Sequence, residues 1–183
     1  MTRLTAINPP EATGKAKELL DAVNKKIGMT PNLMRTMAQS PAVLKAYLNF
    51  SGALAGGSLN AKIREQISLA VAEANSCEYC LSAHTAIGKM VGLSEDAIHQ
   101  ARQSASGDAK TDAALKFARA IVLERGEVSE AEVRQVRDAG FTEGEVAEII
   151  ANVSLNIFTN YFNHIAGTVV DFPKIEFALK KSA

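Results

Sequence analysis

The sequence contains little that could cross-link a small protein or attract a polyanion. Two cysteines among 183 residues are too few for a disulfide scaffold. Lys plus Arg and Asp plus Glu number 20 each, so no excess charge favours nucleic acid or an anionic membrane. No apolar run approaches the roughly 18 residues of a membrane span, and the N-terminus lacks the apolar run of a signal peptide. We therefore expect a protein without nucleic-acid or membrane partners. We also expect it to be cytoplasmic, and in the cytoplasm thiols stay reduced.

Short alternating runs of β-branched residues between turns, the usual signal of strands, are also missing. Apolar residues recur instead at helical spacing, and Ser, Thr, Asn, Pro and Gly stand at positions that begin or end helices. This pattern predicts helices near residues 11–27, 31–39, 41–54, 60–75, 77–91, 94–104, 111–125, 129–138 and 142–166. We therefore predict an all-α protein of about eight helices.

No linker rich in Pro, Gly or Ser divides the chain, and 183 residues suit one well-buried domain. We expect a single domain over 1–183, with an N-terminal helical layer at 1–59. Residues 60–92 would then hold the two cysteine-bearing helices, and residues 93–183 the C-terminal helices. The last helix is apolar on most sides, which predicts a position at the centre of the fold or at a subunit interface.

Both cysteines fall in the segment "EANSCEYCLSAH", residues 73–84. Cys77, Cys80 and His84 are spaced so that they project from one face of a helix over two turns. A thiol of pKa about 8.5 is only a few per cent ionised at pH 7, and a pKa about two units lower would make most of it thiolate. The helix N-terminus favours Cys77 as the more acidic thiol, whereas proximity to His84 favours Cys80. The constellation is typical of a redox-active nucleophile.

Two other interpretations of these residues stay open. Cys77, Cys80 and His84 are zinc ligands, and Glu65 or Glu73 could complete such a site, which would make the chain a zinc-stabilised module. The cysteines could equally be buried structural residues. A c-type haem site is excluded, because that motif needs His directly after the second Cys, where Leu81 stands.

Glu65, Cys77, Cys80 and His84 together resemble the active-site pattern of the alkyl hydroperoxidase D (AhpD)-like family, an all-helical branch of the carboxymuconolactone decarboxylase superfamily. The pattern is a Glu twelve residues before Cys-x-x-Cys-x-x-x-His, and the resemblance covers about residues 44–92. The later segment "NIFTNYFNHIAGTVV" is similar to the closing helix of peroxidase-related members. The resemblance thus implies an AhpD-like fold.

The resemblance also implies a thiol-dependent peroxidase that reduces hydrogen peroxide or organic hydroperoxides. By this resemblance, Cys80 attacks the peroxide and becomes a sulfenic acid, which Cys77 resolves to a disulfide. His84 handles the proton of Cys80, and Glu65 deprotonates Cys77 in a relay. No cofactor or metal is needed, but an external dithiol must supply electrons, from a lipoyl-bearing or thioredoxin-like protein. The resemblance further implies a homotrimer or homohexamer.

One residue departs from the pattern of well-studied members, which carry a His where this chain has Tyr79. A tyrosine of pKa about 10 is a poor base near pH 7, although its hydroxyl can donate a hydrogen bond to a thiolate or peroxide. The decarboxylase branch does not rely on a Cys-x-x-Cys pair, so the two cysteines argue against lactone decarboxylation. A general thiol-disulfide oxidoreductase is the remaining enzymatic alternative.

Further residues are candidates for the substrate pocket. They are Tyr79, Glu73, Asn163 and His164, although a surface or capping role is the simpler expectation for Glu73. Amides on the apolar closing helix, Asn156, Asn160 and Asn163, need partners when buried and could line the pocket or bridge subunits. Met29, Met34 and Met37 form an apolar cluster that is expected to pack in the core, with a pocket for an alkyl tail as the alternative.

Overall fold

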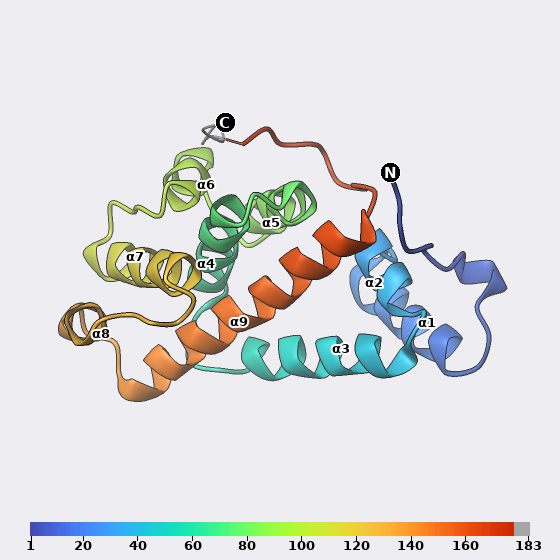
Figure 1. The fold of residues 1–183 in the computed structure, drawn as a ribbon, viewed down its shortest axis with the longest axis horizontal. Coiled ribbons are helices and arrows are strands. Elements are labelled where there is room, and N and C mark those ends of the chain that lie inside the picture. Colours follow the sequence, from blue (N-terminus) through green and yellow to red (C-terminus); the bar gives the residue numbers. More distant parts are fainter. Residues whose placement is uncertain (178–183) are drawn as a thin grey trace.

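The computed structural model describes residues 1–177, which contain nine α-helices and one short 3₁₀-helix (Figure 1). Their bounds are η1 Pro9–Glu11, α1 Gly14–Ile27, α2 Asn32–Met37, α3 Pro41–Ala55, α4 Ala61–Ala74, α5 Glu78–Met90, α6 Glu95–Arg102, α7 Ala109–Leu123, α8 Glu130–Asp138 and α9 Glu143–Ala166. No strand occurs in this described part of the chain. The predicted all-α class is confirmed, and eight of the nine α-helices are of seven residues or more.

Side-chain caps begin most of these helices where the sequence predicts them. The side chain of Asn60 accepts a hydrogen bond of 3.0 Å from the backbone N–H of Ile63 at the start of α4. At the start of α9, Thr142 and Glu145 form the predicted capping box, in which each side chain bonds to the other's backbone N–H. These local bonds satisfy N–H groups that have no partner within the helix.

Two predicted helix starts are wrong, by two residues for α7 and by three for α1. Helix α7 begins at Ala109 rather than near Thr111, because the carboxylate of Asp108 accepts a 2.8 Å hydrogen bond from the N–H of Thr111 and caps the helix. Helix α1 begins at Gly14 rather than residue 11, because the chain turns through η1 and is extended at Thr13 before the helix starts.

Helix α4 lies at the centre of the fold and packs against α5, α6, α7 and α9. Every residue from Gln66 to Glu73 is buried, so α4 has no solvent face along this stretch. Helix α9 runs diagonally between α3 on one side and α4 and α5 on the other (Figure 1). The predicted central position of the last helix is therefore confirmed for the face of α9 that packs against these helices.

The opposite face of α9 presents apolar side chains to solvent. These are Ile150, Phe158, Tyr161 and Ile165. Spacings of three, four and eight residues place them along one side of the helix. Such a face is typical of a protein contact surface, and the homotrimer or homohexamer implied by the resemblance stays a prediction. Within residues 1–177, no helix is both long and apolar enough to cross a membrane.

Glu73 is not a surface or capping residue, which corrects the simpler expectation from the sequence. Its side chain is 1% exposed, and its carboxylate accepts a 2.9 Å hydrogen bond from Nε of Arg102, which is 12% exposed. This ion pair joins α4 to the end of α6. A buried carboxylate needs such a partner because desolvation strongly disfavours an uncompensated charge.

We predict that Arg102→Leu lowers the free energy of unfolding by about 3 kcal/mol, because it removes the cation paired with a buried carboxylate. Urea unfolding followed by circular dichroism measures this change. The control is Lys17→Ala, which removes an exposed pair with Asp21 and should cost less than about 1 kcal/mol. Equal losses in the two variants would contradict a structural role for the buried pair.

Candidate active site

The site is built on the tight junction between α4 and α5. Ser76 adopts a left-handed conformation (φ 52°), and the N–H of Cys77 bonds back to the carbonyl of Ala72 at 2.9 Å. The N–H of Ser76 bonds to the carbonyl of Glu73 at 3.0 Å, which completes the two bonds of a Schellman motif. Cys77 is therefore both the last residue of this motif and the residue directly before α5, and only three residues separate the two helices.

Cys77 itself caps α5, which begins at Glu78 rather than at residue 77 as the sequence predicted. Its Sγ accepts a hydrogen bond of 3.3 Å from the N–H of Cys80. The sulfur of Cys77 also lies 2.6 Å from the sulfur of Cys80 and donates to it. Both cysteines are free thiols, 1% and 2% exposed. The capping geometry thus brings the two sulfurs together.

His84 and Glu65 form a contact beside this thiol pair. Nδ1 of His84, on α5, lies 2.7 Å from Oε2 of Glu65, on α4. The sequence spacing therefore does bring Glu65 into the site, but against His84 rather than directly against Cys77. Both side chains are largely buried, so little solvent screens their charges.

The pKa of His84 is raised above its ordinary value. Burial lowers it, but the charge of Glu65 and its hydrogen bond to the imidazole outweigh that effect. The nearby Cys80 and a hydrogen bond with the side chain of Asn156 raise the pKa further. These contacts therefore favour the imidazolium form of His84, which places a cation beside the thiol pair.

Cys80 is the more acidic of the two thiols. Burial raises the pKa of Cys80, but the hydrogen bond from Cys77, the charge of His84 and the amide of Asn163 lower it to about 7. The same shared hydrogen bond with Cys80, together with burial, raises the pKa of Cys77. From the sequence alone, the helix N-terminus favoured Cys77 as the more acidic thiol and His84 favoured Cys80. In the structure, His84 and the amide side chains lower the pKa of Cys80, so the thiolate forms there.

Cys80 and His84 line an apolar cavity of about 270 Å³. The N-terminal layer supplies one wall, with Ile27, Met29, Pro31, Leu33 and Met34, and α5 supplies Ala83, Ile87 and Met90. Met29 and Met34 therefore belong to a pocket, whereas Met37 is buried in the core as expected. Cys77 does not line the cavity, so Cys80 is the sulfur that a ligand there would meet.

The remaining predicted pocket residues divide into two groups. Tyr79 lines the cavity, and its hydroxyl accepts a 3.1 Å hydrogen bond from the N–H of Leu33. Burial raises the pKa of Tyr79, so its hydroxyl stays protonated. Asn163 reaches the site and donates to the sulfur of Cys80 at 3.2 Å. Glu73 and His164 do not line the cavity: His164 is exposed, and its Nε2 lies 3.0 Å from the carbonyl of Asn75.

The lining residues that the sequence analysis did not single out include Tyr47, Thr159 and Phe172. Burial, the charge of Cys80 and that of Glu65 raise the pKa of Tyr47 to about 12. Phe172 lies beyond α9 and packs edge-on against the ring of Tyr79, with centroids 5.8 Å apart. Each comes from an element distant in sequence from the cysteines, so no short-range spacing could have indicated it.

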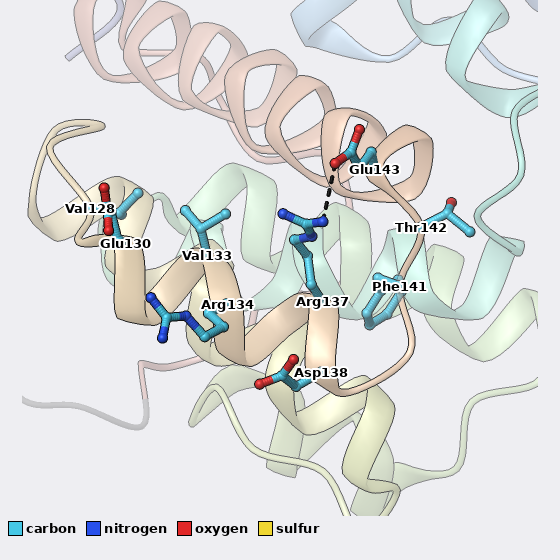
Figure 2. Close-up of a pocket in the computed structure, with 9 residues that line it drawn as sticks. All are labelled: Val128, Glu130, Val133, Arg134, Arg137, Asp138, Phe141, Thr142 and Glu143. Carbon is cyan, nitrogen blue, oxygen red and sulfur yellow. Dashed lines mark ion pairs between the residues drawn. The ribbon is translucent and has the colours of Figure 1, made fainter.

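A larger hollow, of about 890 Å³, lies away from the cysteines between α8 and the start of α9 (Figure 2). Charged side chains dominate it, and Arg137 forms an ion pair of 3.2 Å with Glu143 across it. It contains no Cys or His. Among residues 1–177, no group of three His, Cys, Asp or Glu side chains is arranged to hold a metal ion. The thiol cavity therefore remains the best candidate for chemistry.

Comparisons with known proteins agree with this architecture. Residues 41–124 match the carboxymuconolactone decarboxylase family model. A peroxidase-related protein of Ralstonia eutropha with an alkylhydroperoxidase AhpD core is 26% identical, with a TM-score of 0.83, over 93% of this chain and 92% of that one. A peroxidase-related protein of a Silicibacter species is 23% identical, with a TM-score of 0.79, over 92% and 94%. No curated protein matches the sequence.

The same fold occurs in the debrominase Bmp8, solved in complex with 2,3,4-tribromopyrrole. It is 18% identical, with a TM-score of 0.80, over 93% of this chain and 92% of that one. The helical fold and the match over the cysteine-bearing helices define an AhpD-like protein. The segment that contains both cysteines is thus similar to the carboxymuconolactone decarboxylase family, and the fold of the described residues is that of AhpD-like proteins.

We predict that His84→Gln raises the pKa of Cys80 from about 7 by about one unit or more, because the variant removes the adjacent cation. The ultraviolet absorbance of the thiolate, followed against pH, measures the ionisation of the first thiol. His99→Gln, which changes an exposed histidine on α6, is the matched control. An unchanged Cys80 pKa in His84→Gln would show that the imidazolium does not stabilise the thiolate.

Proposed function

We propose that the protein is a thiol-dependent peroxidase that reduces hydroperoxides through a dithiol–disulfide cycle of Cys77 and Cys80. The observation that carries the proposal is the position of Cys80. Its side chain lines an apolar cavity, its thiol has a pKa of about 7, and the sulfur of Cys77 lies 2.6 Å from its own. Such a thiolate is a strong nucleophile at neutral pH, and its neighbour is placed to resolve the first product.

In the first step, the Cys80 thiolate attacks the terminal oxygen of the hydroperoxide. An S–O bond forms and the O–O bond breaks, which leaves a sulfenic acid on Cys80 and an alkoxide. The alkoxide takes a proton to leave as an alcohol. His84 supplies this proton, since its raised pKa keeps it protonated while the thiolate forms beside it.

In the second step, Cys77 attacks the sulfur of the Cys80 sulfenic acid. The S–S bond forms, the S–O bond breaks, and the hydroxyl leaves as water with the proton of the Cys77 thiol. The raised pKa of Cys77 keeps that thiol protonated until the sulfenic acid forms, so it does not compete for the peroxide. An external dithiol then reduces the disulfide and becomes a disulfide itself.

Glu65 acts in this scheme through His84. The resemblance implies that Glu65 deprotonates Cys77, and the 2.7 Å contact with His84 makes the imidazole the first stage of that route. Glu65 and His84 also line a second, smaller hollow of about 150 Å³, which shares His84, Tyr47 and Thr159 with the apolar cavity. The imidazole therefore borders both hollows, and we propose that protons leave the site through this second one.

The cavity favours organic hydroperoxides over hydrogen peroxide. Methionine, leucine, isoleucine and aromatic side chains dominate its walls, so an alkyl or aryl group gains from leaving water there. Hydrogen peroxide has no apolar surface to bury. We therefore expect a lower KM for a hydroperoxide with a bulky apolar group.

Burial of the thiols also argues for the kind of reductant. Because Cys77 and Cys80 are 1% and 2% exposed, a protein disulfide on a folded surface cannot approach them, which disfavours a general thiol-disulfide oxidoreductase. A slender dithiol on a flexible arm, such as a lipoyl group, could enter the cavity as far as Cys80. Of the two reductants implied by the resemblance, we therefore propose the lipoyl-bearing protein.

We predict that one equivalent of cumene hydroperoxide converts the wild-type dithiol to a disulfide, with loss of two hydrogens in the intact mass. Cys77→Ser should stop at a sulfenic acid that dimedone traps, because the resolving thiol is gone, whereas Cys80→Ser should not react. Turnover with dihydrolipoamide should exceed the reduction of insulin disulfides.

Three results would contradict the peroxidase proposal. Unreacted thiols in the wild type would favour a structural role for the cysteines. A zinc ion in the intact mass, with unfolding by chelators, would favour the metal-stabilised module. Rapid insulin reduction without peroxide consumption would favour the general oxidoreductase.

We also propose that copies of the chain associate through the exposed apolar face of α9. Phe158→Glu combined with Tyr161→Glu should convert the assembly to a monomer in light scattering, since two charges would be buried in the contact. The control is Leu123→Glu, which places the same charge at an exposed leucine on α7. A monomeric wild type, or an assembly unaffected by the double variant, would contradict this proposal.

A further inference from the structure

Two amides of α9 meet the sulfur of Cys80. Asn160 and Asn163 are three residues apart on the buried face of α9 and are 0% and 5% exposed. Nδ2 of Asn163 donates a 3.2 Å hydrogen bond to the sulfur of Cys80, and the side chain of Asn160 also lowers the pKa of that thiol. Both amides therefore belong to the immediate surroundings of the reacting sulfur.

Each of these amides has one polar atom without a hydrogen-bond partner within the described chain. Asn160 accepts a 3.0 Å bond from Asn75 through Oδ1, but its Nδ2 is unpaired. Asn163 donates to Cys80, but its Oδ1 is unpaired. Buried polar atoms are nearly always hydrogen-bonded, so an unpaired donor and an unpaired acceptor beside one nucleophile call for an explanation.

The species formed at Cys80 in the proposed cycle complements these two atoms. The terminal group of a hydroperoxide and the sulfenic acid made from it are both a hydroxyl, which donates one hydrogen bond and accepts others. The thiolate before the reaction and the disulfide after it carry no such oxygen. Among the described residues, before the reaction, the amide of Asn160 has only the sulfur of Cys80 as a neighbouring acceptor, and Oδ1 of Asn163 has no donor. Both atoms are therefore fully matched only in the part of the cycle in which an oxygen is bound.

We propose that Asn160 and Asn163 form the binding site for the oxygen atom that Cys80 removes from the hydroperoxide. Nδ2 of Asn160 donates to that oxygen, and Oδ1 of Asn163 accepts its hydrogen. As the thiolate forms the S–O bond and the O–O bond breaks, the hydroxyl keeps its hydrogen, and the departing alkoxide takes the proton of His84. The inference rests on the proposed peroxidase function and adds two catalytic residues to it.

The test separates oxygen transfer from thiolate reactivity. In the Cys77→Ser background, rate constants of the Cys80 thiolate are extracted from pH profiles for two reagents, iodoacetamide and cumene hydroperoxide. Alkylation by iodoacetamide brings no oxygen to the site. We expect Asn160→Leu to slow the peroxide reaction by about 10-fold, the effect of losing one hydrogen bond that positions the transferred oxygen. Alkylation should change little.

Two further variants complete the test. Asn75→Ala is the matched control, because it breaks the same bond to Oδ1 of Asn160 but leaves the amide nitrogen in place. It should react like the parent with both reagents. Asn163→Leu removes the hydrogen bond to Cys80 but leaves the bond between Asn75 and Asn160 in place, so it provides a second test if Asn160→Leu does not fold. It should also slow the peroxide reaction more than alkylation.

Three outcomes would overturn the inference. Equal slowing of both reagents would show that the amides serve only the thiolate. An equal loss of peroxide reactivity in Asn75→Ala would show that packing, not the amide nitrogen, matters. If the Cys77→Ser parent itself does not react with peroxide while iodoacetamide still alkylates it, the proposed peroxidase function fails and this inference fails with it.

Discussion

The contact between His84 and Glu65 is the interaction on which the proposed chemistry depends. A thiolate as buried as Cys80 would be strongly disfavoured without a nearby cation, because desolvation raises a thiol's pKa. The imidazole of His84, which is also largely buried, would lose its proton more readily without a nearby anion. Glu65 keeps His84 charged, and His84 in turn keeps Cys80 ionised. Removal of any member therefore affects the other two, so these three residues act as one unit.

The backbone junction at Ser76 imposes the geometry within which this unit works. A non-glycine residue in the left-handed region costs about 1 kcal/mol or more, and here it allows α5 to begin after only three residues beyond the end of α4. The short junction directs the side chain of Cys77 over the first turn of α5, where the N–H of Cys80 meets its sulfur. A longer loop would give Cys77 more freedom and separate the sulfurs. The strained residue is thus located where the sulfur positions are decided.

Features set by local sequence were predictable, and features set by distant segments were not. Helical periodicity and capping residues indicated nearly all the helices, and the spacing of Cys80 to His84 indicated that the two share a face. The capping role of Cys77 was missed, because serine is the usual cap and thiol caps are rare. The partner of Glu73 and the cavity contacts of Tyr47 and Phe172 depend on packing between elements far apart in the chain. A single sequence does not indicate which distant elements pack together.

The position of the cavity constrains the order of events in the proposed cycle. Cys80 lines the cavity and Cys77 does not, so hydroperoxide and reductant must reach the same sulfur by the same route. A reductant that attacks Cys80 of the disulfide expels Cys77 as a thiolate. Such a leaving group is poor when its pKa is raised, but the N–H of Cys80 stabilises it as it forms. The thiol cap of α5 therefore serves the return half of the cycle, while His84 and the amides of α9 serve the forward half.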